Sequence, residues 1–176
     1  MTADGKGYLL HSSTCSLWPG RNERETLQGA LDWYRAVVGH KVDGLTLDQA
    51  RTVLTPTGLS ILGVIKHLGL VERDWFRETF AGERVGPADS GEDNSADFVI
   101  EPGDTIESVL TFYRDEAERS RQVTAGSSLD SLSARETSLG EHVSLRWVLV
   151  HMLEETARHA GHMDLMRENI DGRTGD

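Results

Sequence analysis

The chain has 176 residues, of which 38% are hydrophobic and 27% are charged. These shares are typical of one globular domain, and the length is sufficient to bury a core without disulfides or structural metals. A net charge of −11 argues against a nucleic-acid partner, because binding to phosphates needs clustered Lys and Arg. The sequence also lacks an apolar run of about 18 residues, so it predicts a cytoplasmic protein that does not span a membrane.

Residues 1–21 show neither helical nor strand periodicity and contain a Pro19-Gly20 pair. This pattern predicts an N-terminal extension ahead of a domain that spans 22–176. Cys15, the only cysteine, lies in this extension, so an intramolecular disulfide and a cage of several thiolates are both excluded. We interpret Cys15 as a thiol without a chemical role.

Apolar periodicity and capping signatures predict four long helices and one short helix. In order, they span residues 23–40, 46–53, 59–80, 104–124 and 144–172. The pairs Asn22 with Glu25, Thr46 with Gln49, and Asp104 with Glu107 match the capping box, and Ser144 is a further N-cap. Two long irregular stretches lie at 82–103 and 126–143, and the first of them is expected to be a lid or a crossover. The sequence therefore predicts an all-α helical bundle.

The last predicted helix carries four side chains that are able to bind a metal. His151, Glu155, His159 and His162 are spaced four, four and three residues apart. At about 100° per residue, these offsets place all four within one narrow stripe along the helix. The spacing alone does not choose among them.

Two ligands four residues apart on one helix can converge on a single ion, and a third ligand must then come from another helix. Glu155 and His159 provide such a pair, and His67 on the predicted helix 59–80 is the natural third residue. Histidine and carboxylate ligands without cysteine suit zinc, nickel, iron or manganese. A set of three protein ligands is typical of catalytic zinc, because it leaves one coordination position open. The alternative is that these residues are exposed on the surface or are hydrogen-bonded in the core without a metal.

The remaining candidates are given supporting or structural roles. His151 and His162 could replace a ligand, or could orient Glu155 or His159 from beside the site. Three further histidines, His11, His40 and His142, are expected to be solvated, and Trp75 and Trp147 are expected to anchor the core.

Three segments of the chain resemble the DinB-like superfamily, and within it the mycothiol-transferase branch. They are RETL at 24–27, TPTGLSILGVIKHLGLVERDWF at 55–76, and WVLVHMLEETARHAGHMDLMRENIDGRTG at 147–175. The resemblance covers most of the chain from Asn22 onward and leaves the N-terminal extension outside it. It implies a four-helix bundle with up-down-down-up order, to which this chain adds the short extra helix and two long loops.

The resemblance also implies a ligand set for a divalent metal. Members of the superfamily hold the metal with a histidine of the second helix and with an H-x₃-H or E-x₃-H pair of the last helix. The matching residues here are His67, Glu155 and His159. His162 falls where relatives often have Gln or His, so it is expected to support the site together with His151.

The activity implied by the resemblance is thiol transfer, in which a mycothiol-like thiol attacks an electrophilic small molecule with the help of a metal, most simply zinc. Arg73 and Arg158 are weak candidates for binding polar parts of the thiol, and each could equally form a surface ion pair. The acidic stretch 82–103 could cover the site. A homodimer is also expected from the resemblance.

Three other functions stay open at this point. The first is a non-catalytic metal-binding or stress-response bundle, whose site is structural or empty. The second is a thiol-dependent isomerase, although the smaller second domain of that enzyme is missing from this sequence. The third is a metal hydrolase, because a metal-bound hydroxide suits the same ligands.

Overall fold

The computed structural model describes residues 22–85 and 94–175, and every named element within them is helical. The elements are α1 (Glu23–His40), α2 (Leu47–Arg51), α3 (Ile61–Glu72), η2 (Arg73–Phe80), η3 (Asn94–Phe98), α4 (Ile106–Ala125) and α5 (Leu145–Asp171). The predicted all-α class is thus confirmed for these residues. The predicted extension 1–21, with Cys15 and His11, lies outside the described residues, as does the middle of the stretch 82–103.

Local capping explains where most of the helices begin and end. The side chain of Asn22 accepts a hydrogen bond from the backbone N–H of Glu25, and Ser144 caps α5 in the same way. Thr46 and Gln49 form the predicted reciprocal capping box. At its other end α5 stops at Gly172, whose φ of 75° lies in the left-handed region that favours glycine.

One predicted cap is wrong by one residue. Helix α4 is capped by Thr105 and Ser108, which form the capping box in place of the predicted Asp104 and Glu107. Asp104 instead accepts a hydrogen bond from the backbone N–H of Glu101 and pairs with Lys66 at 3.3 Å. Both candidate pairs have suitable side chains, and the tertiary contact of Asp104 with α3 decides between them.

The predicted helix at 59–80 also differs from the structure in one respect. It begins at Ile61 as the α-helix α3, but from Arg73 it continues as the π-helix η2. A π-helix pairs each N–H with a carbonyl five residues back instead of four. Apolar spacing reports which face of a helix is buried, and it does not report this change in backbone pairing.

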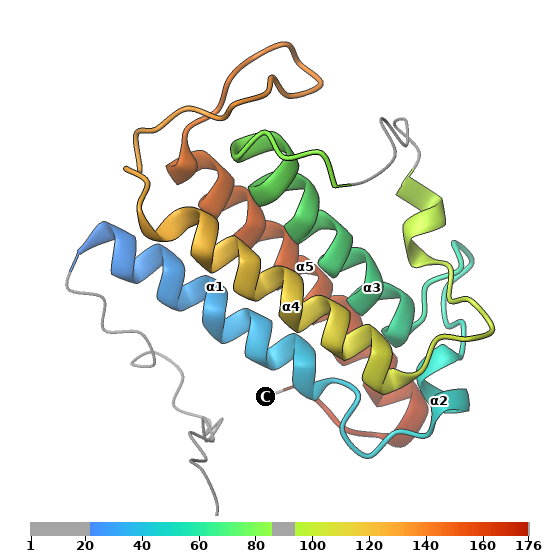
Figure 1. The fold of residues 1–176 in the computed structure, drawn as a ribbon. Coiled ribbons are helices and arrows are strands. Elements are labelled where there is room, and N and C mark those ends of the chain that lie inside the picture. The colour runs from blue at the N-terminus through green and yellow to red at the C-terminus, as the bar shows by residue number, and fades with distance from the viewer. Residues whose placement is uncertain (1–21, 86–93, 176) are drawn as a thin grey trace, which may run out of the picture.

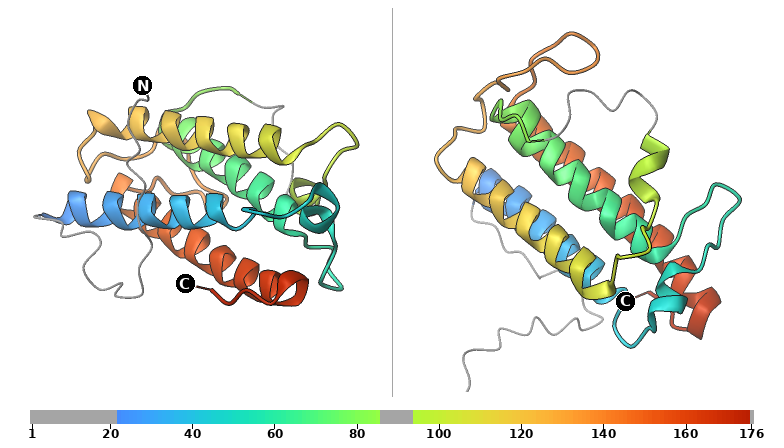
Figure 2. Two further views of the ribbon diagram at one scale, coloured as in Figure 1. Left: turned by 90° about the horizontal axis from the view of Figure 1, so that it is seen from below. Right: turned by 45° about the vertical axis from the view of Figure 1, so that its right-hand side comes forward.

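The four long helices pack side by side (Figures 1 and 2). Helix α1 contacts α5, α3 contacts α4, and both α3 and η2 contact α5. Helices α1 and α5 run in one direction, and α3 and α4 run in the opposite direction (Figure 1). Within the described part of the chain, no helix is long and apolar enough to cross a membrane.

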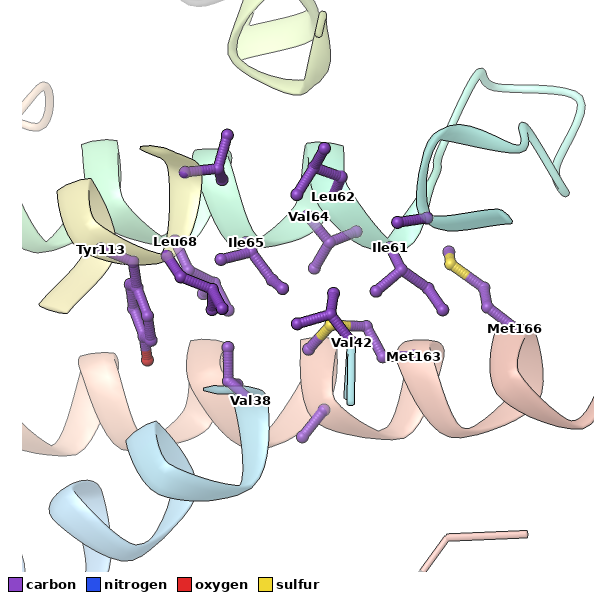
Figure 3. Packing of buried hydrophobic residues seen from close by; sticks show 14 of the residues in the cluster. Val38, Val42, Ile61, Leu62, Val64, Ile65, Leu68, Tyr113, Met163 and Met166 are labelled. Atoms are coloured by element: carbon purple, nitrogen blue, oxygen red, sulfur yellow. The ribbon is translucent and has the colours of Figure 1, made fainter. Parts of the chain in front are cut away.

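The core consists of two hydrophobic clusters that follow one another along α5. In the first cluster, Ile61 and Ile65 of α3 are buried with Met163 and Met166 of α5 (Figure 3). The second cluster is built from Leu31, Phe76, Leu145, Val148, Leu149 and Met152 with their neighbours. Each such side chain contributes about 1.5–3 kcal/mol when it is fully buried. Along α5, Met152 is the last buried member of the second cluster and Ala160 the first of the other, and Glu155 and His159 lie between them.

Candidate metal centre

Helices α3 and α5 bring His67, Glu155 and His159 together. The Oε1 atom of Glu155 lies 3.3 Å from Nε2 of His67 and 3.0 Å from Nε2 of His159. One ligand atom from each residue can be chosen such that all three lie within 4.8 Å of one another. Glu155 and His159 are neighbours on one face of α5 because they are four residues apart. His67 joins them only through the packing of α3 on α5.

The site is largely screened from solvent. His67 and His159 are 4% and 7% exposed, and the Glu155 side chain is 15% exposed. Hydrogen bonds from His159 and His67 hold the pKa of Glu155 well below its usual range, although burial opposes this effect. Glu155 is therefore a carboxylate at neutral pH, held between two imidazole rings.

Each of the three residues also contacts a neighbour on its outer side. Nδ1 of His159 lies 3.5 Å from Nδ1 of His162, so the His162 ring borders the cluster. The second carboxylate oxygen of Glu155, Oε2, accepts a hydrogen bond of 3.2 Å from Arg158. His67 stacks on the ring of Phe98 at 4.1 Å, and its Nδ1 faces Asp97 at 3.6 Å.

Two residues beside His67, Asp97 and Phe98 of the short helix η3, were not predicted from the sequence. The stretch 82–103 is acidic and irregular in sequence, and a cover over the site is one of its predicted roles. The described end of this stretch does lie against His67. The sequence signal was a carboxylate next to an aromatic residue within an otherwise polar loop, which is too common to be decisive.

The donor set fits a divalent transition metal. Two imidazole nitrogens and one carboxylate oxygen are ligands that zinc, nickel, iron and manganese accept. Nδ1 of His67 is buried and lacks a hydrogen-bond partner among the described residues. The Nε2 atoms of His67 and His159 both face one carboxylate oxygen of Glu155, as ligands of one centre would.

His151 does not contact these three residues through any described hydrogen bond. Its ring packs against Trp75 at 4.5 Å and stacks nearly parallel to Trp147 at 5.0 Å. Burial lowers the pKa of His151, and the charge of Glu155 opposes this shift. Trp147 is 44% exposed, so the prediction that it anchors the core is wrong, whereas Trp75 packs partly buried against the second cluster.

The two candidate arginines differ in their surroundings. Arg158 lies beside the site and pairs with Glu154 as well as with Glu155. Arg73 pairs with the buried Glu116 of α4 at 2.9 Å, and its guanidinium covers the ring of Phe112 at 4.9 Å. The structure therefore brings Arg158, and not Arg73, to Glu155.

The two described histidines that were expected to be solvated are exposed. The side chain of His40 is 55% exposed and contacts Asp43 at 2.8 Å. His142 is exposed in the loop before α5, and its Nδ1 lies 2.8 Å from the backbone oxygen of Ser133. Neither lies in the cluster that α3 and α5 form.

Comparison with known proteins agrees with the resemblance noted in the sequence. The family model described as Mycothiol-S-transferase matches residues 26–172, a range that contains His67, Glu155 and His159. A search of curated proteins found no match. The family match covers most of the chain, and the chain therefore belongs to the mycothiol-S-transferase family, a branch of the DinB-like superfamily.

Proposed function

We propose that this protein is a metal-dependent thiol S-transferase that conjugates a mycothiol-like thiol to an electrophilic small molecule. The observation that carries the proposal is the cluster of His67, Glu155 and His159, which lies within the part of the chain that matches the family. We assign these three residues as the ligands of one divalent cation, most simply zinc. The DinB-like up-down-down-up order is part of the same proposal, and the opposed directions of the helix pairs α1/α5 and α3/α4 support it.

The cation, when bound, would stabilise a thiolate and lower the pKa of its thiol, which makes the nucleophile available at neutral pH. The residues of the chain prepare the site for this task. Glu155 is ionised and offsets part of the cation's charge, while the low exposure of His67 and His159 excludes water from the ligand atoms. Three protein ligands without a fourth are typical of a catalytic site.

We also propose that Arg158 helps to bind polar groups of the thiol. Its side chain is 52% exposed, so its free N–H groups can reach a ligand while it pairs with Glu154 and Glu155. Arg73, the other candidate, has its guanidinium engaged by Glu116 and Phe112. We therefore assign this role to Arg158 in preference to Arg73.

A direct assay tests the proposed activity. Purified full-length protein loaded with zinc is mixed with mycothiol and either a bromobimane or a chloronitrobenzene, and conjugate formation is compared with the uncatalysed rate. We expect a rate above background with the loaded protein, and none with protein treated with a chelator or with His159→Ala. A rate equal to background for mycothiol, bacillithiol and glutathione, with zinc bound, would contradict the transferase and favour a non-catalytic metal-binding bundle.

A further inference from the structure

The second ring nitrogen of His67, Nδ1, indicates a role for a residue that is not among the three proposed ligands. Nε2 of His67 faces Glu155, and Nδ1 is buried without a hydrogen-bond partner among the described residues. A histidine that binds a metal through Nε2 is neutral, so its proton sits on Nδ1. This nitrogen then becomes a buried donor, which needs an acceptor.

Asp97 presents such an acceptor to this nitrogen. Its Oδ2 lies 3.6 Å from Nδ1 of His67, slightly beyond hydrogen-bond length, and a movement of about 0.5 Å would close the bond. The Asp97 side chain is 24% exposed and the His67 side chain 5%, so the contact lies at the inner edge of η3. A carboxylate on the outer nitrogen of a metal-bound histidine fixes the tautomer and the direction of the ring.

Three contacts with α3 hold η3 in this position. Phe98, next to Asp97, stacks on the imidazole of His67 with 21° between the ring planes. One turn earlier on α3, a Cβ on Gly63 would lie 2.4 Å from the backbone oxygen of Phe98, so only glycine permits this close approach. Lys66 donates a hydrogen bond of 2.7 Å to the backbone oxygen of Val99. Figure 2 shows η3, in yellow-green, beside α3.

We propose that Asp97 is a positioning residue, which accepts a hydrogen bond from Nδ1–H of His67 and keeps Nε2 of that ring directed at the metal centre. This proposal rests on the proposed function, because it assumes that His67 is a metal ligand. The short helix η3 then has a defined role. It supplies the hydrogen-bond acceptor for His67, which is the one proposed ligand that does not come from α5.

Zinc affinity tests the proposal without an activity measurement. The full-length variants Asp97→Ala and Asp97→Asn compete with a chromophoric chelator for zinc, with Glu101→Ala as the control. Glu101 is an exposed carboxylate four residues further along the same segment. We expect Asp97→Ala to bind zinc about 10- to 100-fold more weakly than the wild type. Asp97→Asn, whose amide oxygen still accepts a hydrogen bond, should lose less, and Glu101→Ala should stay within twofold of the wild type.

A second measurement depends only on the wild type and on Asp97→Ala. Long-range ¹H–¹⁵N spectra of the zinc-loaded proteins report the proton on Nδ1 of His67, which we expect to exchange slowly in the wild type and rapidly in the variant. Equal zinc affinity for the wild type and Asp97→Ala, or equally fast exchange, overturns the role of Asp97 and leaves the transferase proposal intact. A wild-type protein that binds no zinc overturns the proposed ligand set, and the role of Asp97 with it.

Discussion

Oε1 of Glu155 lies 3.3 Å from Nε2 of His67, although the two residues are 88 positions apart in the chain. This contact joins α3 to α5, and His159 approaches the same carboxylate oxygen from the next turn of α5. The Glu155 carboxylate, whose side chain is 15% exposed, lies between these two imidazoles. The proposed metal site and the pH dependence of the metal-free protein therefore both depend on this cluster.

Metal content depends on the two histidines. We expect purified wild-type protein to hold about one divalent cation per chain, because three convergent ligands bind a single ion. His67→Ala and His159→Ala should each reduce the content strongly, and the double variant should abolish it. Elemental analysis of protein purified without a histidine tag measures this, with the exposed His40→Ala as the control. Metal retained by the double variant would exclude the assigned site.

We expect acid to lower the stability of the metal-free protein through Glu155. Its pKa in the folded protein lies below the value of about 4.3 in an unfolded chain, so the ionised carboxylate stabilises the fold above that pH. The contribution is lost as the pH falls from about 4.3 toward the folded-state pKa. In chelator-treated protein, the difference in unfolding free energy between wild type and Glu155→Gln should therefore shrink on acidification below pH ~4.

Urea denaturation at a series of pH values provides this measurement. Glu168→Gln, which changes an exposed carboxylate on the same helix, is the control and should show no such trend. A difference between wild type and Glu155→Gln that stays constant from neutral pH into acid would show that Glu155 is not stabilised by the two histidines.

Among the polar contacts of the core, the buried ion pair between Arg35 and Glu72 is expected to contribute most to the free energy of unfolding. Two hydrogen bonds of 2.6 and 2.7 Å connect the guanidinium with the carboxylate, and the Glu72 side chain is fully buried. Glu72→Gln leaves the buried Arg35 with only the exposed carboxylate of Asp32, at 2.8 Å, as its ionic partner, and should cost about 3–5 kcal/mol of unfolding free energy. Glu23→Gln, which breaks the exposed pair with Arg146, should cost far less, because solvent screens the charges of that pair.

Chemical denaturation of the two variants measures their free energies of unfolding and tests this prediction. Replacing both Arg35 and Glu72 with apolar residues should restore much of the loss, because no charge then stays buried alone. Equal, small losses for Glu72→Gln and Glu23→Gln would show that the buried pair does not contribute in this way.

Two helical glycines should respond in opposite directions to alanine. Gly161 is an exposed residue of α5 with open space around its Cα, so Gly161→Ala should stabilise the protein by about 0.5–1 kcal/mol. Gly63→Ala gains the same helix propensity but forces its Cβ against the backbone oxygen of Phe98. It should therefore destabilise the protein and displace η3. Thermal unfolding measures both, and stabilisation by Gly63→Ala would show that η3 is not packed closely on α3.

The features that depend on residues close together in the chain could be predicted from the amino-acid sequence. Asn22, Thr46 and Ser144 cap their helices because each side chain reaches an N–H within the next turn. Glu155 and His159 share a face because of the helical repeat, and that much required no knowledge of the fold. The sequence also indicates His67, on another helix, as the third residue of the candidate site, with the family resemblance in support.

Contacts between residues far apart in the chain could not be predicted in the same way, because they depend on how the helices pack. Asp97 and Phe98 lie against His67. They can do so because Gly63 lets η3 approach α3 closely, and no spacing in the sequence predicts that contact. Arg73 pairs with Glu116 on α4, and Trp147 is exposed. Nothing in the sequence around these two residues distinguishes them from other arginines and tryptophans. Periodicity specifies the faces of each helix, whereas the choice of neighbour for each face depends on the packing of all the helices together.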